Sequence, residues 1–301
     1  MHDSSVGGPL LWPADEPWPT CPQPYFASPP LTTLADIRTQ RALLTDAWSR
    51  SAAGQDFMTP HEREMVDRLR AGTLNVLPSG PSALIPLAQL YARDAPALSF
   101  PEGTDLLQVL WAASRGLEGC SSEIQLRWRA SGDVEDVLMS PPEPAFVEAS
   151  EHVPEPCVLR PEQVFEYPPG HLLDGELEQQ ANEWSKTNGF GYWDFYAVAP
   201  GWKAGGWPAG FTFRDPPDPE EQECGECGGP VDALLTVASG EWDGATGHWC
   251  PIEDGEDAEK PVGYPYRSAL DPTMVTIGRG YTLQLYYCLN SPEHLPRTIV
   301  Q

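Results

Sequence analysis

Residues 224–229 read Cys-Gly-Glu-Cys-Gly-Gly, and residues 280–288 read Gly-Tyr-Thr-Leu-Gln-Leu-Tyr-Tyr-Cys, with a histidine at position 294. The first stretch is a tight glycine turn that carries two thiols. The second has the composition of a β-strand and ends in a third thiol. Zinc prefers thiolate and imidazole ligands, and a Cys-x-x-Cys pair spans two corners of its tetrahedron. The sequence therefore predicts one zinc site that closes a β-rich region, with the ligands Cys224, Cys227, Cys288 and His294.

Alternatives to this assignment stay open at the level of sequence. Cys250, between Trp249 and Pro251, competes with His294 for the fourth ligand position. The Cys-x-x-Cys pair is also found in redox couples, but those sit in a βαβ context that is not apparent here. The thiols can also remain metal-free. Four protein ligands leave no open position for water or substrate, so the predicted zinc is structural.

The charge of the chain narrows the classes of partner. Among 301 residues, 44 are acidic and 18 are Lys or Arg, which gives a formal net charge of -26. A nucleic-acid-binding protein needs the opposite sign, so direct DNA or RNA binding is not expected. An acidic surface attracts basic proteins, although the same charge also serves solubility alone.

The cysteine content and the apolar pattern bear on location. The chain has seven cysteines, an odd number, and two of them form the Cys-x-x-Cys pair, which favours metal or redox chemistry over a disulfide framework. No run of eighteen or more apolar residues is present, and the N-terminus lacks the profile of a signal peptide. We therefore expect a cytoplasmic protein that does not enter membranes.

The periodicity of apolar residues predicts an α+β fold, mostly antiparallel β. A helix is expected from Thr33 to about Ser51, with its buried face at positions 34, 37, 44 and 48, and a second helix after the capping sequence Thr59-Pro60-His61-Glu62. A short helix is expected at 176–185. Strands are expected at 84–91, 106–111, 124–129, 164–167, 234–237 and in the stretch that ends at residue 288.

The two β-rich parts share an order of features. Each begins with Gly-Gly near Trp-Pro, at 7–13 and at 205–208, and each continues with a cysteine, a Leu-rich strand and a strand that contains Leu-Gln. We interpret this as an internal duplication; the alternative is two unrelated β segments of similar composition. The predicted parts are an N-terminal pseudo-repeat at 1–130 with a helical insertion at 31–80, a Pro- and Glu-rich connector at 131–190, and a C-terminal pseudo-repeat at 191–301 that carries the zinc site.

This order of Gly-Gly, Trp-Pro, cysteine turn, Leu-rich strand and Leu-Gln-aromatic strand resembles the bacterial YwqG-like family, which is uncharacterised. More distantly it is similar to the eukaryotic programmed cell death protein 2 family. The residues that carry the resemblance are Gly205-Gly206, Trp207-Pro208, Cys224, Cys227 and 283–288. The eukaryotic relatives imply a holding chaperone for a basic ribosomal protein. Cys21 departs from the pattern, because Pro24 stands where a second thiol would fall, so no metal is expected in the first copy.

The predicted function is a non-enzymatic protein-binding module, acting as a chaperone, an adaptor or a toxin-neutralising protein and stabilised by structural zinc. No Gly-x-Ser-x-Gly, His-Glu-x-x-His or phosphate-loop motif is present. The alternative is an enzyme such as a hydrolase, with carboxylates in a cleft between the repeats. Tryptophans beside proline or glycine either line a groove for an extended peptide or close the ends of the β layers, namely Trp12, Trp18, Trp202 and Trp207.

Overall fold

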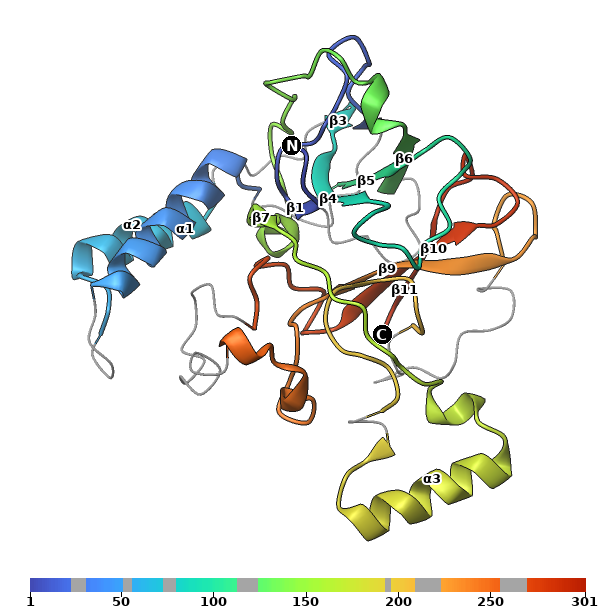
Figure 1. The fold of residues 1–301 in the computed structure, drawn as a ribbon. Helices are drawn as coiled ribbons and strands as arrows, with labels where there is room; N and C mark the ends of the chain where they lie inside the picture. Colours follow the sequence, from blue (N-terminus) through green and yellow to red (C-terminus); the bar gives the residue numbers. More distant parts are fainter. Residues whose placement is uncertain are drawn as a thin grey trace.

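The first of two antiparallel sheets contains five strands in the order β6-β5-β4-β1-β7 (Figure 1). The structure is a computed structural model, and it describes residues 1–22, 31–50, 56–72, 80–112, 124–192, 196–208, 223–254 and 270–301. The strands of this sheet are β1 (Ser5–Val6), β4 (Ile85–Tyr91), β5 (Leu106–Trp111), β6 (Ile124–Arg129) and β7 (Cys157–Val158).

The second sheet contains four strands in the order β11-β10-β9-β8. Its strands are β8 (Lys203–Ala204), β9 (Val231–Ala238), β10 (Thr282–Cys288) and β11 (Arg297–Val300). A separate two-stranded ladder joins β2 (Thr20–Cys21) to β3 (Ser82–Ala83). Every strand pairing among the described residues is antiparallel, which confirms the predicted fold class.

Both sheets bury side chains in one shared apolar core. Leu87 and Val109 come from the first sheet, Leu234 and Leu285 come from the second, and all four belong to the same buried cluster. The ring of Trp128 on β6 also lies 6.0 Å from that of Tyr287 on β10, centroid to centroid. Because neither sheet can bury its apolar face alone, this shared core holds the two sheets together.

Two helices between β2 and β3 follow the capping signals of the sequence. Thr33 is the N-cap of helix α1 (Leu34–Ser49), and its side chain accepts the N–H of Asp36. Helix α2 (Pro60–Arg70) begins at Thr59, which forms the predicted capping box with Glu62. These predictions are confirmed. Trp48, expected on the buried face of α1, is 41% exposed and instead meets Phe57 edge to face.

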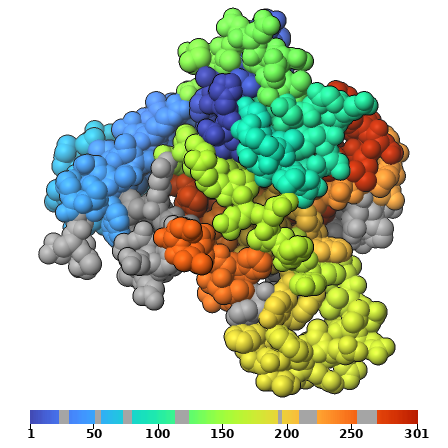
Figure 2. Space-filling model, viewed as in Figure 1, coloured from blue at the N-terminus to red at the C-terminus, as the bar shows by residue number. Residues whose placement is uncertain are grey.

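Helix α3 (Gly175–Asn188) projects from the body of the molecule (Figures 1 and 2). Asp174 caps its N-terminus, and Gly189 ends it in the left-handed conformation, with φ +75°. None of its residues is buried. Short 3-10 turns complete the described elements, namely η2 (Ser131–Asp133), η3 (Ser150–His152), η4 (Gly170–Leu172), η6 (Gly247–Trp249) and η7 (Ile252–Asp254).

The predicted strand at 164–167 is wrong. This segment is extended but belongs to no sheet, and Phe165 is 94% exposed. The segment is held instead through Glu166, whose carboxylate binds Lys203 at 2.8 Å and accepts the N–H of Ala199 at 2.7 Å. The Tyr167 N–H also donates to the carbonyl oxygens of Tyr196 and Ala197, at 3.0 and 3.1 Å. The contacts of Glu166 and this one backbone donor, without a strand ladder, therefore hold the stretch beside β8.

Four strands of the first sheet follow the same order as the four strands of the second sheet, and β7 has no counterpart. In the first, β1 pairs with β4, β4 with β5 and β5 with β6; in the second, β8 pairs with β9, β9 with β10 and β10 with β11. The registers also agree in detail. Gly7, after β1, has φ +59° and donates its N–H to Leu87 O at 3.0 Å, whereas Gly205, after β8, has φ +70° and donates to Leu234 O at 3.0 Å.

The correspondence extends to the segments that carry the first cysteine of each half. Cys21 pairs with Ser82 across the β2–β3 ladder, and the N–H of Cys224 donates to Gly229 O at 2.8 Å. Between Cys21 and Ser82 the chain forms α1 and α2. Between Cys224 and Gly229 it forms only the turn at 225–228. The helices thus occupy the sequence position that the cysteine turn occupies in the other half.

Within the described residues, no helix combines the length and the apolar character needed to cross a membrane. The longest described helix is α1, with 16 residues.

Candidate metal centre

The turn that carries Cys224 and Cys227 is a closed backbone loop. An isolated bridge between Glu223 and Pro230 ends it, and the N–H of Gly228 donates to Cys224 O at 2.8 Å. Gly228 has φ +64°, a conformation that residues with a Cβ rarely adopt. The sequence therefore needs glycine at 228 so that the backbone can turn back beneath both sulfurs.

The register of the second sheet brings the third thiol to this turn. Cys288, the last residue of β10, lies opposite Val231, the first residue of β9, and the turn directly precedes β9. The Leu289 N–H continues the contact by donating to Pro230 O at 3.0 Å. Cys224 and Cys288 are each 3% exposed, whereas Cys227 is exposed. Strand pairing therefore places residue 288 beside residues 224 and 227.

A second turn returns His294 to the same place. The His294 N–H points to Ser291 O at 3.4 Å, which closes the bend after β10. The next residue, Leu295, donates its N–H to the carboxylate of Glu226 at 2.6 Å, and Glu226 belongs to the cysteine turn. This hydrogen bond joins the two turns and fixes the imidazole among the sulfurs.

The four donor atoms form a compact group. Cys227 Sγ lies 3.6 Å from Cys288 Sγ, and His294 Nδ1 lies 3.4 Å from Cys224 Sγ and 3.3 Å from Cys288 Sγ. All four donor atoms lie within 4.8 Å of one another. A tetrahedral zinc ion holds its sulfur ligands about 3.8 Å apart and a sulfur and a nitrogen about 3.5 Å apart. The group therefore has the size needed for a metal ion.

Cys227 and Cys288 differ in how readily their thiols lose a proton. The backbone N–H of Gly229 stabilises the thiolate of Cys227 and lowers its pKa, and Asn290 Nδ2 lies 3.7 Å from the same sulfur. Burial raises the pKa of Cys288, because the charged form loses its hydration. A bound cation compensates a buried thiolate, so metal binding and deprotonation of Cys288 are coupled.

The rival ligand does not join this group. The Cys250 sulfur lies 3.4 Å from Pro251 O, and Cys250 is not among the four residues that converge. The sequence analysis did not single out Glu226 or Asn290, although both stand within two residues of a predicted ligand.

The equivalent place in the first half is apolar. Cys21 is 2% exposed and packs in one cluster with Leu84, Leu110 and Ala112. Ala112 directly follows β5 in the first half, at the place that corresponds to Cys288 at the end of β10 in the second half. Pro24 lies outside the described residues, so the prediction for it is not addressed by the structure. Cys120 and Cys157 have no partner at metal-ligand spacing in the sequence, which predicts that both are buried apolar residues. Cys120 also lies outside the described residues, and Cys157 is half-buried on β7.

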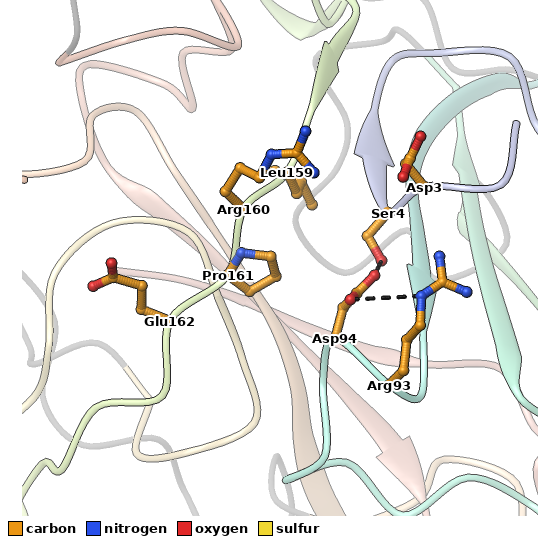
Figure 3. Close-up of a pocket in the computed structure, with 8 residues that line it drawn as sticks. All are labelled: Asp3, Ser4, Arg93, Asp94, Leu159, Arg160, Pro161 and Glu162. Atoms are coloured by element: carbon orange, nitrogen blue, oxygen red, sulfur yellow. Dashed lines mark hydrogen bonds and ion pairs between the residues drawn. The ribbon is translucent and has the colours of Figure 1, made fainter. Parts of the chain in front are cut away.

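A surface cavity of 480 Å³ lies between the N-terminus, the turn after β4 and the segment after β7 (Figure 3). Ser4 Oγ donates to Asp94 Oδ2 at 2.7 Å and accepts the Tyr91 N–H at 3.0 Å. Arg93 Nε lies 3.7 Å from Asp94 Oδ1. The Ser4 hydroxyl donates to the Asp94 side chain and accepts the backbone N–H of Tyr91, so it joins the N-terminal segment to the end of β4.

Two carboxyl groups with raised pKa values lie elsewhere. Burial raises the pKa of Glu241 to about 7, and burial also raises that of Asp271 to about 6. Glu241 lies against Gly201 and the Trp202 N–H, which is 3.4 Å from its Oε2. Neither carboxyl lines the cavity of Figure 3, so the cavity and the perturbed carboxyls do not form one site.

The tryptophans beside proline and glycine mostly close the β layers. Trp12 is 1% exposed and packs on Trp18 at 5.0 Å, and the indole N–H of Trp18 donates to Leu84 O at 2.9 Å. The indole N–H of Trp202 donates to Ala238 O at 2.9 Å. Trp207 differs, because 36% of it is exposed. Three of the four thus have structural roles.

Comparisons with known proteins add no relative: no family model, curated protein or solved structure matches the chain.

Proposed function

We propose that Cys224, Cys227, Cys288 and His294 hold one structural zinc ion. The support is the donor set of three sulfurs and one imidazole, together with separations that fit a tetrahedral ion. Softer thiolate-rich sets favour zinc over magnesium, calcium or manganese. The cytoplasm keeps thiols reduced and able to bind a metal, and we place the protein there.

The ion would join three parts of the second sheet. Its ligands come from the turn before β9, the end of β10 and the loop before β11. Because the group forms only when the strands pair, binding energy at the ion is also folding energy. The test is metal analysis of purified protein: we expect about one zinc per chain. Substoichiometric zinc, or unchanged thermal stability after chelation, would contradict a stabilising role.

On this framework we propose a non-enzymatic protein-binding module that acts as a chaperone, an adaptor or a toxin-neutralising protein. The observation that carries the proposal is the number of exposed large apolar side chains between residues 164 and 207, nine among the described residues, in a chain with a formal net charge of -26. Exposed apolar groups favour protein contacts, and the acidic field favours basic partners.

The likeness to the YwqG-like family and, more distantly, to the programmed cell death protein 2 family is also a proposal, as is the internal duplication. The order of four strands that the two sheets share supports the duplication, and so do the matching hydrogen bonds of Gly7 and Gly205. Under this proposal the first copy accepted the helices α1 and α2 and kept only Cys21 of the metal ligands.

The experiment is co-purification at low and at high ionic strength, followed by cross-linking. We expect basic proteins to be recovered at low salt and lost at high salt, because salt screens attraction between exposed charges. Chelator-treated protein is the matched control, which tests whether recovery of partners requires the metal-stabilised second sheet. Recovery of no partner, or recovery that does not depend on salt, would count against the proposal.

A further inference from the structure

Exposed large apolar side chains are frequent between residues 164 and 207. We call residues 164–192 and 196–207, which include the projecting helix α3 (Figure 2), the α3 lobe. Its exposed apolar side chains include nine of the 16 found among the described residues, namely Val164, Phe165, Tyr167, Leu172, Leu177, Trp184, Phe190, Tyr196 and Trp207. Soluble proteins seldom gather such side chains without a binding role.

Helix α3 presents an apolar stripe that remains largely exposed among the described residues. Leu177, Ala181 and Trp184 recur at spacings of four and three, so they share one face. Leu177 is 51% exposed and Trp184 is 41% exposed, although the Trp184 ring meets Tyr196 edge to face at 5.2 Å. A helix of 14 residues is marginally stable without tertiary packing, so covering this face would stabilise it.

The lobe continues into the second sheet, because its residues Lys203 and Ala204 form β8 and pair with Thr236 and Leu235 of β9. Contacts within the lobe hold its segments together. Glu166 forms an ion pair with Lys203 at 2.8 Å, with side-chain exposures of 10% and 13%. The same carboxylate accepts backbone N–H groups from Ala199 and Trp207. On the helix side, Ser185 Oγ accepts the Tyr192 N–H at 3.0 Å. The apolar stripe is therefore displayed in a set position.

The charge around the stripe has one dominant sign. Asp174, Glu176, Glu178 and Glu183 lie on or next to α3, against the single basic residue Lys186. Within the described residues, the ion pairs found for the chain include none of these four carboxylates. The surface thus combines apolar groups with negative charge that forms no ion pair with a basic residue in the described part of the chain.

We propose that the apolar stripe of α3 and its acidic border form the docking surface for a basic, amphipathic segment of a partner protein. This inference rests on the proposed protein-binding function and assigns it a place. The negative charge of this surface determines which kind of partner can bind to it. A second copy of the chain carries the same formal net charge of -26 and would be repelled, and so would an anionic lipid surface.

The test uses a defined probe, a synthetic helix of leucine and lysine with leucines at helical spacing, measured by fluorescence anisotropy against the full chain. Two matched peptides replace lysine with glutamate, or leucine with serine. The protein variants are the double change Leu177→Ser with Trp184→Ala, and the triple change Glu176→Gln, Glu178→Gln and Glu183→Gln. Trp48→Ala is the matched control, because Trp48 has the same 41% exposure on another helix.

We expect the leucine–lysine helix to bind, and both control peptides to bind at least about tenfold more weakly. The apolar double variant should lose affinity by a similar factor, the triple variant should lose most of the salt dependence, and Trp48→Ala should bind as the parent does. Glutamine has nearly the helix propensity of glutamate, so the triple variant tests the surface even if the double variant weakens α3.

Four results would overturn the assignment. If the parent binds the peptide and both α3 variants bind equally well, docking occurs elsewhere and the protein-binding function stands. If the parent binds no peptide but retains salt-sensitive partners in co-purification, this surface alone is refuted. If the parent neither binds the peptide nor retains salt-sensitive partners, the proposed protein-binding function is refuted as well. A dimer in sedimentation that the double variant dissociates would show that a second copy covers the stripe.

Discussion

Cys227 Sγ and Cys288 Sγ lie 3.6 Å apart, although 61 residues separate them in the chain. The turn at 224–229 alone gives two ligands, and two ligands do not retain a metal ion well. The antiparallel register that sets Cys288 opposite Val231 supplies the third. A metal centre on this group therefore depends on correct pairing of β9 with β10, and it reports on that pairing.

Replacement of Cys288 should abolish the metal centre. We expect Cys288→Ala to lose bound zinc and to lower the free energy of unfolding by about 3 kcal/mol, the stabilisation that a ligand gives at about a hundred times its dissociation constant. Cys250→Ala is the matched control and should keep full zinc, because Cys250 does not join the group. Metal analysis and chemical denaturation measure both quantities. Equal zinc contents in the two variants would refute the assignment.

The two equivalent glycines should differ in their tolerance of alanine. Both have positive φ, so each substitution costs about 1–2 kcal/mol from backbone strain. A Cβ at Gly205 would lie 3.4 Å from Leu98 Cδ2, an ordinary contact, but at Gly7 it would lie 2.8 Å from Pro154 Cβ. We therefore expect Gly7→Ala to destabilise the protein by about 1 kcal/mol more than Gly205→Ala does. Urea unfolding of both variants measures the difference, and equal losses would contradict it.

The buried carboxyl of Glu241 should make stability depend on pH. Its pKa is raised from 4.5 to about 7, first by burial, so the folded state favours the protonated form. The folded state then binds more protons than the unfolded state, and the free energy of unfolding falls as pH rises from about 4.5 to about 7. The loss should be about 2 kcal/mol, less than a fully buried group would show, because the side chain is partly exposed.

Glu241→Gln tests this origin. The variant should remove most of the pH slope and should be more stable than the parent above about pH 7. Asp271 contributes to the same field, and its own raised pKa of about 6 leaves a smaller slope in the variant. Denaturation at a series of pH values measures the slope. A variant with the parent's slope would show that other groups cause the dependence.

The ion pair of Glu166 and Lys203 should hold the segment at 164–167 against β8 within the α3 lobe. Glu166→Gln leaves the Lys203 ammonium without its counter-ion in a site where burial already lowers the pKa of Lys203. We expect a loss of about 3 kcal/mol and faster proteolysis within the lobe. The double variant Glu166→Gln with Lys203→Met removes the stranded charge and should recover part of that stability. Protease protection of the lobe in the single variant would contradict this role.

Local sequence determined the helices and the main strands. The capping residues Thr33 and Thr59 start α1 and α2 where expected, since a cap is satisfied by neighbours three residues away. The strands around Gln108 and Gln284 were also predictable from their apolar runs. The pattern at 164–167 misled, because Glu166 finds its partner Lys203 in a distant segment.

Sequence by itself also indicated which residue types can bind a metal, and it named the three thiols that converge, with His294 as the fourth candidate and Cys250 as its rival. It did not decide between His294 and Cys250, because both lie in turns of similar composition. Tertiary structure decided this: a hydrogen bond from Leu295 to Glu226 brings the histidine to the sulfurs, whereas Cys250 stands beside Pro251 O. Chemical preference is a property of single residues, but coordination requires a common place, and only long-range strand pairing provides it.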